Sequence, residues 1–241
     1  MNRYLGRLSD KQKMEREKFL EQSKEGCPFC DLTTRKNDIV IKTPNFIALI
    51  DKAPATDQYY VVFPKKHMLS YYEVPEEEGI EVDEIIKRLK EKTGRENVVL
   101  FENGAGNKRD GDCGVISHQS VYHSHLNTVL LPDGMEVMSE IKQRFFDNKV
   151  PMWELEPDGF NHIKAAQELT DGKAYFYVRQ GRSAFLAIEE EKVIPSQFVR
   201  RTVADVFNNH QTSAFWAWKN IKKEYQLEIE MRKETMRQLF W

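Results

Sequence analysis

This sequence lacks long apolar runs and carries little net charge, and each shortage excludes a class of protein. No apolar run approaches the length that a membrane span needs, and the N-terminal residues form no secretory apolar region. The formal net charge of −2 creates no overall field that would attract nucleic acid in bulk. We therefore expect a cytoplasmic protein that binds neither membranes nor nucleic acid in bulk.

Cysteine is also scarce, and the three cysteines are an odd number. Two of them, Cys27 and Cys30, form a Cys-x-x-Cys motif. In a reducing compartment this spacing favours metal or redox chemistry over a structural disulfide. Gly26 ends a charged helix predicted over 10–25, so the two thiolates are expected in a tight turn typical of the first half of a zinc knuckle.

The apolar patterns predict an α+β protein with a mainly antiparallel sheet and helices packed on it. Three short strands separated by turn residues form an antiparallel meander, at 38–42, 46–50 and 59–63. An amphipathic helix over 75–92 follows. The apolar run at 98–101 is typical of a central strand, and it leads into a glycine-rich, charged loop at 102–114.

A polar row on an otherwise apolar strand, predicted over 121–131, organises the rest of the chain. Successive side chains of a strand point to opposite faces, so His123, His125 and Asn127 are expected on one side at a spacing of about 7 Å. Imidazoles in such a place need hydrogen-bond partners, a metal or a substrate. The row therefore marks a candidate site.

Four residues in the first half of the chain have side chains that zinc prefers: Cys27, Cys30, His67 and His123. Thiolates and imidazoles together suit a tetrahedral zinc ion, so we predict a zinc site. The alternative is a pair of buried free thiols.

If His123 binds zinc, His125 is the imidazole left for chemistry. A neutral imidazole can attack phosphorus when a backbone carbonyl fixes its tautomer. The charge that develops on the phosphoryl oxygens then needs donors already aimed at it. The candidate donors are Asn103, Gln119 and Ser120, together with backbone amides of the turn at 104–106.

These motifs resemble the histidine triad (HIT) superfamily, whose signature has histidines at three alternating positions. The lead into that signature is matched here at 119–122, and the segments 46–54 and 61–67 resemble the nucleotide-pocket strands of the family. The resemblance covers about 26–132. It implies a HIT-like antiparallel sheet, an enzyme that acts on nucleotides, and a homodimer.

The resemblance also implies roles for single residues. His125 stands where the nucleophile of the family forms a nucleotidyl-histidine intermediate, and Asp51 matches the carboxylate that binds ribose hydroxyls. The apolar residues that flank the base correspond to Phe46, Ile47 and Ile50. The phosphate contacts correspond to Asn103, Gln119 and Ser120. The zinc ligands of the metal-containing branch correspond to Cys27, Cys30, His67 and His123.

The third position of the triad departs from the signature, because Asn127 replaces histidine. The hydrolase branches have His there, whereas the galactose-1-phosphate uridylyltransferase and dinucleoside polyphosphate phosphorylase branches have Gln. An amide binds a phosphoryl oxygen but cannot shuttle a proton, which favours transfer over hydrolysis. We predict a nucleotidyltransferase or phosphorylase acting on a dinucleoside polyphosphate or sugar nucleotide. A HIT-type nucleotide hydrolase and a catalytically silent nucleotide-binding module are the alternatives.

We divide the chain into a catalytic core at 1–132, with the N-terminal helix and zinc knuckle, and a C-terminal α/β extension at 133–241. The extension is predicted to contain helices at 135–146, 161–169, 195–208 and 220–240, an irregular link at 150–159, and a hairpin of strands at 174–179 and 184–189. We interpret it as a reduced second half of the fold that packs on the core and offers a dimer surface.

Overall fold

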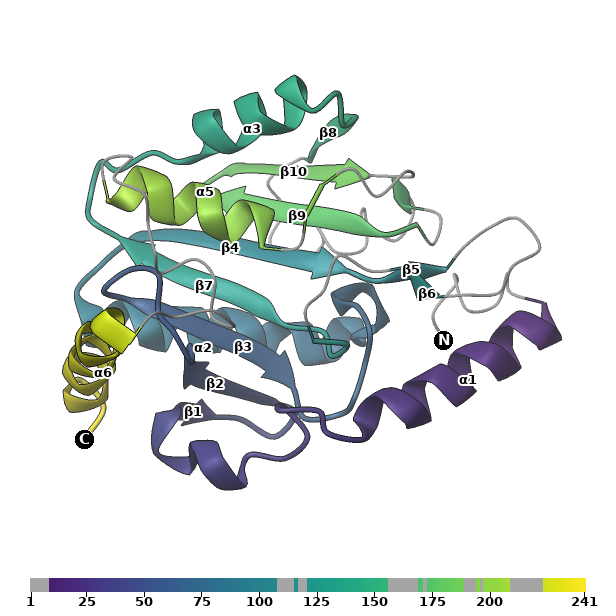
Figure 1. Cartoon of the computed structure of the whole chain (residues 1–241), viewed down its shortest axis with the longest axis horizontal. Coiled ribbons are helices and arrows are strands. Elements are labelled where there is room, and N and C mark those ends of the chain that lie inside the picture. The colour runs from purple at the N-terminus through teal and green to yellow at the C-terminus, as the bar shows by residue number, and fades with distance from the viewer. Residues whose placement is uncertain are drawn as a thin grey trace.

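A computed structural model describes residues 9–107, 115–116, 121–155, 169–170, 173–188, 194–195, 197–208 and 223–241. Its centre is an eight-stranded sheet with the order β1-β2-β3-β7-β4-β9-β10-β8, in which every neighbouring pair is antiparallel (Figure 1). The strands are β1 (Ile39–Lys42), β2 (Phe46–Ile50), β3 (Tyr59–Pro64), β4 (Asn97–Gly104), β7 (Leu126–Leu131), β8 (Met152–Leu155), β9 (Tyr175–Gln180) and β10 (Ser183–Ile188). A separate pair joins β5 (Gly106–Asn107) to β6 (Val115–Ile116).

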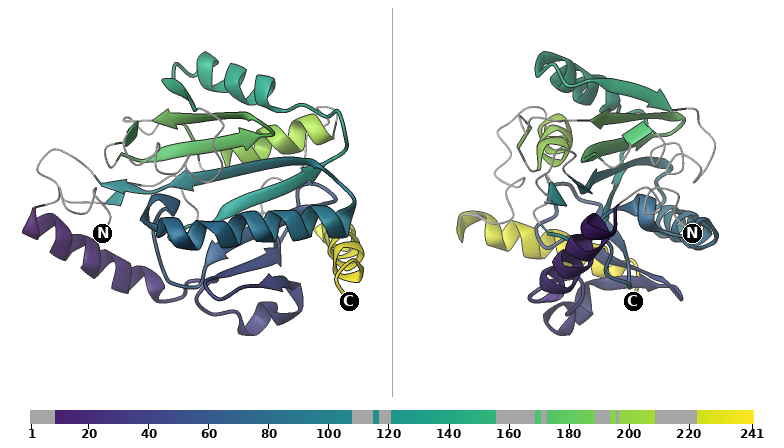
Figure 2. Two further views of the ribbon diagram at one scale, coloured as in Figure 1. Left: turned by 180° about the vertical axis from the view of Figure 1, so that it is seen from behind. Right: turned by 90° about the vertical axis from the view of Figure 1, so that its right-hand side faces the viewer.

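Helices cover both faces of this sheet. The α-helices are α1 (Asp10–Lys24), α2 (Glu76–Thr93), α3 (Met138–Asp147), α5 (Phe198–Phe207) and α6 (Lys223–Gln238), and short 3₁₀ helices span Thr33–Asp38 and Tyr71–Glu73. Helix α2 lies on one face, while α3 and α5 lie on the other (Figures 1 and 2). Helix α6 packs beside β2 and the 3₁₀ helix Thr33–Asp38.

Strand alternation sorts the side chains into two hydrophobic cores. In β2, Phe46 and Ile50 belong to the core shared with α2, whereas Ile47 belongs to the core shared with α3 and α5. In β7, Leu130 faces α2 and Val129 faces α3 and α5. Asn127, two residues before Val129, therefore lies on the α3 and α5 face.

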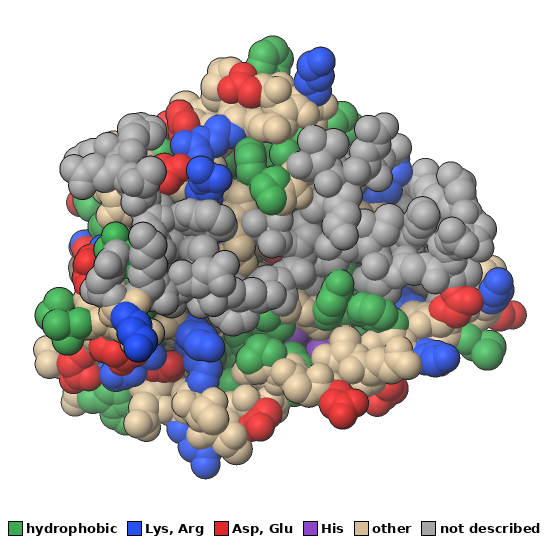
Figure 3. Space-filling model, in the orientation of Figure 1, with side chains coloured by type: hydrophobic (Ala, Val, Ile, Leu, Met, Phe, Trp, Pro, Cys, Tyr) green, Lys and Arg blue, Asp and Glu red, His purple; other side chains and the backbone are tan. Residues whose placement is uncertain are grey.

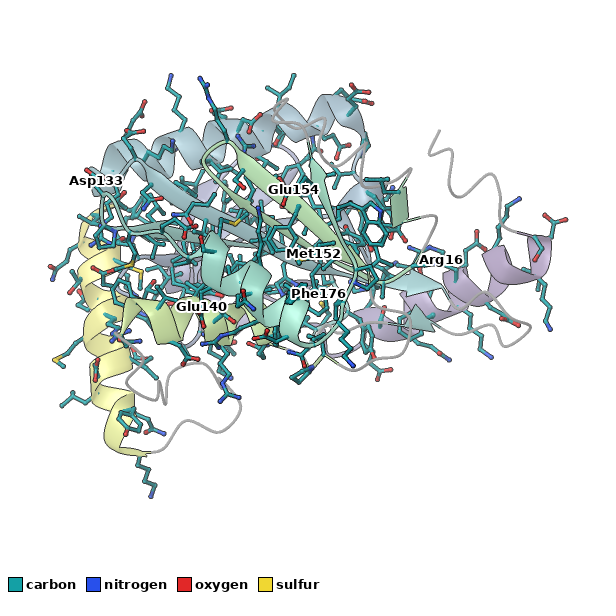
Figure 4. All side chains as sticks on the ribbon, turned by 90° about the horizontal axis from the view of Figure 1, so that it is seen from above. Arg16, Asp133, Glu140, Met152, Glu154 and Phe176 are labelled. Carbon is teal, nitrogen blue, oxygen red and sulfur yellow. The ribbon has the colours of Figure 1, made fainter. Side chains whose placement is uncertain are left out.

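The extension continues the same sheet, because β9 pairs with β4 and β10 pairs with β9. Phe176 on β9 contacts the Phe145 ring of α3, with ring centroids 5.3 Å apart (Figure 4). Lys142 Nζ on α3 lies 2.8 Å from Glu154 Oε1 on β8 (Figure 4). The β4–β9 pairing therefore joins the extension to the core in one sheet, and the two side-chain contacts pack α3 against β9 and β8 within the extension.

The predicted α+β class, the meander β1-β2-β3, the central position of β4 and the β9-β10 hairpin are confirmed. The predicted loop at 102–114 is wrong at its start, because β4 continues to Gly104. The link predicted as irregular at 150–159 contains β8, which pairs with β10. Most of the helix predicted at 161–169 lies outside the described residues. Within the described residues, no helix is long and apolar enough to cross a membrane.

One correction concerns the polar row itself. His123 and His125 lie in the segment that approaches β7, and the strand begins only at Leu126. The backbone of Ser124 donates to the carbonyl of Met68 at 2.6 Å, outside the sheet pairing. The two histidines are therefore held by loop contacts, and only Asn127 is held by the strand ladder.

Candidate functional site

The structure brings Cys27, Cys30, His67 and His123 together, and their ligand atoms all lie within 4.8 Å of one another. Cys30 Sγ is 3.1 Å from His67 Nδ1, and Cys27 Sγ is 3.4 Å from His123 Nδ1. Three separate segments thus meet at one point: the knuckle turn, the segment after β3 and the approach to β7. The four donors match the thiolate and imidazole set of a tetrahedral site, so this cluster can hold a metal ion.

In both imidazoles of the cluster, a hydrogen bond at Nε2, on the side of the ring away from the sulfurs, fixes the tautomer. His123 Nε2 donates to the Pro64 carbonyl at 2.8 Å. The Ser23 hydroxyl donates to the Leu20 carbonyl, so it accepts from His67 Nε2 at 2.8 Å. Each ring therefore points the lone pair of Nδ1 toward the sulfurs, which is the arrangement that a ligating histidine requires. Burial lowers the pKa of His123 to about 3, which keeps the ring neutral.

A cavity of about 440 Å³ lies beside this cluster. Most of its described lining comes from residues 1–132, including Phe29, Asp51, Asn103, His125 and Asn127, and the extension adds Gln197, Arg200 and Lys233. On the face shown in Figure 3, histidine surface is visible at one point among hydrophobic side chains. Among the described residues, the charged lining comprises four cations, Arg35, Lys52, Arg200 and Lys233, and two carboxylates, Asp38 and Asp51. The excess of cations suits an anionic ligand.

The backbone of His123 orients His125. His123 belongs to the metal-ligand cluster, by which we mean Cys27, Cys30, His67 and His123. Its Nδ1 donates to the His123 carbonyl at 2.7 Å, which leaves the lone pair on Nε2. Burial lowers the pKa of His125, although the hydrogen bond to the carbonyl acts in the opposite direction. The ring lines the cavity as a neutral imidazole with a nucleophilic nitrogen.

Asn127 is fixed at both ends of its carboxamide. The Tyr59 hydroxyl donates to Asn127 Oδ1 at 2.9 Å, and Asn127 Nδ2 donates to the Phe101 carbonyl at 3.4 Å. Asn127 Oδ1 therefore already accepts a hydrogen bond from a residue of β3. The amide hydrogen that Phe101 does not take is the group that Asn127 can offer to a ligand oxygen in the cavity.

Asp51 directly follows β2 and is bonded to a residue of the extension. Arg200 Nη2 lies 2.9 Å from Asp51 Oδ1, and the Ala53 amide donates to the same oxygen at 2.8 Å. Burial by itself raises the pKa of Asp51, but Arg200, the Ala53 amide and Arg35 together hold the pKa below its usual value. Asp51 is therefore ionised at neutral pH.

Sequence reasoning missed Arg200 and Lys233 as cavity residues. Each stands in a helix far along the chain from the recognised motifs, and nothing in the local pattern distinguishes it from surface cations. Pro195, shortly before α5, marks a helix start, but it gives no reason to place Arg200 in the cavity.

The other predicted nucleotide contacts occupy different places. Asn103, near the end of β4, lines the cavity, and its buried Oδ1 finds no hydrogen-bond partner among the residues that the structure describes. Phe46 and Ile50 lie on the opposite face of the sheet against α2, and Ile47 lies in the other core without lining the cavity. Gln119 and Ser120 lie outside the described residues.

The fold and the site thus define an antiparallel α+β protein with a Cys₂His₂ cluster beside a cation-rich, histidine-bearing cavity. Residues 26–142 match the family model described as "Scavenger mRNA decapping enzyme C-term binding". Adenosine 5′-monophosphoramidase hnt1 of Schizosaccharomyces pombe is 27% identical over 111 residues, which are 44% of this chain and 75% of that protein. The family match at 26–142 covers the same part of the chain as the motifs that resemble the histidine triad superfamily.

The solved structures that match this chain include two enzymes. Yeast Ap4A phosphorylase Apa2 is 10% identical, with a TM-score of 0.46 and coverage of 79% of each chain. A HIT family hydrolase from Clostridium thermocellum is 19% identical, with a TM-score of 0.35, and the match covers 47% of this chain and 97% of that one.

Proposed function

We propose that this protein transfers nucleotidyl groups from a nucleoside phosphate, a dinucleoside polyphosphate or a sugar nucleotide, through a covalent intermediate on His125. The observation that carries this proposal is the bond from His125 Nδ1 to the His123 carbonyl, because it leaves Nε2 as a neutral nucleophile at a cation-rich cavity. The phosphoramidase and the phosphorylase among the similar proteins support an enzyme of this kind.

The proposed reaction has two balanced steps. In the first, Nε2 of His125 attacks the α-phosphorus, the bond to the leaving-group oxygen breaks, and the leaving group departs with that electron pair. The proton on Nδ1 stays on the hydrogen bond to the His123 carbonyl. In the second, an oxygen of inorganic phosphate or of a sugar phosphate attacks the same phosphorus, and the electron pair of the phosphorus–nitrogen bond returns to Nε2.

Asn127 is the residue that favours transfer over hydrolysis. In the proposal its amide donates to a phosphoryl oxygen of the intermediate, while Tyr59 holds the carboxamide in place. A carboxamide does not take a proton from water at neutral pH, so water is activated poorly. An acceptor that is already ionised, such as a phosphate, needs no such base.

The four residues of the metal-ligand cluster, Cys27, Cys30, His67 and His123, would hold a zinc ion. When bound, zinc would stabilise the knuckle turn and fix the His123 backbone whose carbonyl orients His125. Metal analysis of the purified protein tests this assignment. We expect about one zinc per chain and loss of that zinc in Cys27→Ser, and full alkylation of both thiols in the native protein would contradict it.

A nucleotide hydrolase is the second candidate, because the Schizosaccharomyces pombe relative is named as a phosphoramidase. The two functions differ in their need for an acceptor. Diadenosine tetraphosphate and a sugar nucleotide should be consumed at a rate that depends on added inorganic phosphate or sugar phosphate. Equal release of mononucleotide without any acceptor would contradict transfer and support hydrolysis.

A catalytically silent nucleotide-binding module is the third reading. Mass spectrometry after rapid acid-free quenching distinguishes it, because a covalent nucleotidyl adduct is expected on His125 and should be absent in His125→Ala. Nucleotide binding without an adduct and without turnover would support the silent module. The homodimer, the cytoplasmic location and the division at residue 132 remain predictions, and light scattering on the full chain tests the first.

A further inference from the structure

Arg200 connects the C-terminal part of the chain to the nucleotide cavity. It lies in the first turn of α5, beyond the family match at 26–142, and is only 3% exposed. Its Nη2 is 2.9 Å from Asp51 Oδ1 and also donates to the carbonyl of Ala53. A buried arginine bound to both the side chain and the following backbone of one turn restrains that turn strongly.

The carboxylate of Asp51 is held in one orientation by these contacts. Arg200 and the Ala53 amide both donate to Oδ1, at 2.9 Å and 2.8 Å. The two donors fix the rotation of the carboxylate, and they use one oxygen only. Asp51 lines the cavity, so Oδ2 is the oxygen that remains for a ligand hydroxyl.

Arg200 also contacts the residue that supports Asn127. Its guanidinium carbon lies 4.5 Å from the centroid of the Tyr59 ring, and the Tyr59 hydroxyl donates to Asn127 Oδ1 at 2.9 Å. Arg200 therefore supports two groups of the cavity. It bonds the carboxylate of Asp51 directly, and it packs on Tyr59, which holds the carboxamide of Asn127. A lysine could keep the charge but not this set of directed contacts.

We propose that Arg200 is a positioning residue for ribose recognition, which it achieves by holding Asp51 with one oxygen presented to the ribose hydroxyls. This inference deepens the proposed function and rests on it. Its consequence is that the preference for ribonucleotides over 2′-deoxynucleotides depends on a residue of the extension. The catalytic histidine and the metal-ligand cluster are not part of this device.

The test measures the equilibrium affinity of the full chain for AMP, GMP, CMP and UMP and for their 2′-deoxy counterparts. Loss of a charge-assisted hydrogen bond changes affinity by about tenfold to a hundredfold. Arg200→Gln should lower the ratio of ribonucleotide to deoxynucleotide affinity by about tenfold. Arg200→Lys should restore only part of that ratio. The matched control is Arg201→Gln, because Arg201 is the next residue of α5 and its side chain is 56% exposed.

A double-mutant cycle shows whether Arg200 acts through Asp51. Asp51→Asn should abolish the ribose preference, and Asp51→Asn with Arg200→Gln should lose no more than Asp51→Asn alone. The double variant also removes both charges together, so it avoids the buried unpaired carboxylate that could unfold Arg200→Gln. Thermal melting confirms that each variant is folded.

The outcomes separate the inference from the proposed function. A wild-type protein that binds none of the eight nucleotides would contradict the proposed function and the inference with it. A wild type that prefers ribonucleotides, with an unchanged preference in Arg200→Gln, would overturn the inference alone. Additive losses in the double variant would also overturn it, because they would mean that Arg200 contacts the nucleotide directly.

Discussion

Glu102 offers the sharpest test of how the sheet supports the site. It lies in β4, is 1% exposed, and accepts hydrogen bonds from three groups. These are the Tyr71 amide at 3.0 Å, the Ser124 hydroxyl at 2.8 Å and the Tyr175 hydroxyl at 2.5 Å. Burial raises the pKa of Glu102 to about 7, although the three bonds lower it. The carboxyl group therefore stays protonated in the folded protein far above its usual range.

The sign and size of the effect follow from proton linkage. In the unfolded chain the pKa is 4.5, so between that value and about 7 the folded state binds more protons. The free energy of unfolding that Glu102 contributes therefore falls as the pH rises through this window. Integration between about pH 5 and pH 8 gives a loss of about 2 to 3 kcal/mol. Above pH 8 no further loss is expected from this group.

Glu102→Gln removes the titration and keeps the shape of the side chain. We expect the difference in unfolding free energy between wild type and Glu102→Gln to change by about 2 to 3 kcal/mol from pH 5 to pH 8, in favour of the variant at high pH. Urea denaturation followed by tryptophan fluorescence measures it. Glu84→Gln, at an exposed position of α2, is the matched control for the Glu to Gln substitution itself. A difference that stays constant across this range would refute the reasoning.

Three further predictions concern close contacts of the site. Gly104→Ala should destabilise the protein by about 1 to 3 kcal/mol, because an added Cβ would lie 2.0 Å from Tyr175 Cε1, and thermal unfolding checks this. Ser23→Ala should lower metal affinity by about tenfold to a hundredfold, since it removes the partner of His67 Nε2, and competition with a chelator measures the change. Asn127→His should raise the share of nucleotide released to water relative to an acceptor, because an imidazole can move a proton, and product analysis with and without phosphate decides it.

Much of the first half of the chain could be predicted from the sequence because its signals are local. The meander depends on short apolar strands broken by turn residues, and these signals placed β2 at Phe46–Ile50. The metal-ligand cluster was predicted by residue type, since cysteine and histidine at these positions have one common chemistry, and the structure brings the four together. The position of His125 beside that cluster was predicted in the same way.

The exact bounds of strands and loops could not be predicted from local signals. The predicted strand through His123 and His125 is wrong, because hydrogen bonds to the Met68 carbonyl and to the Pro64 carbonyl at the end of β3 hold this segment away from the sheet ladder. The predicted loop at 102–114 failed at its start because Glu102 finds three donors inside the protein. The sequence predicts a charged residue to be exposed. Only hydrogen-bond partners in the tertiary structure can make its burial stable.

The sequence by itself indicated the class of fold and the four residues whose side chains gather in a cluster that can hold a metal ion, because both depend on residue type and spacing. Only the tertiary structure decided that Arg200 and Lys233, from helices near the end of the chain, line the same cavity as His125. It also decided that Asp51 is bound by Arg200 and that Tyr59 holds Asn127. The two residues of the Tyr59–Asn127 pair are 68 positions apart in the sequence, and those of the Asp51–Arg200 pair are 149 positions apart. No local pattern encodes such contacts, because they arise only when the folded sheet brings the two parts of the chain together.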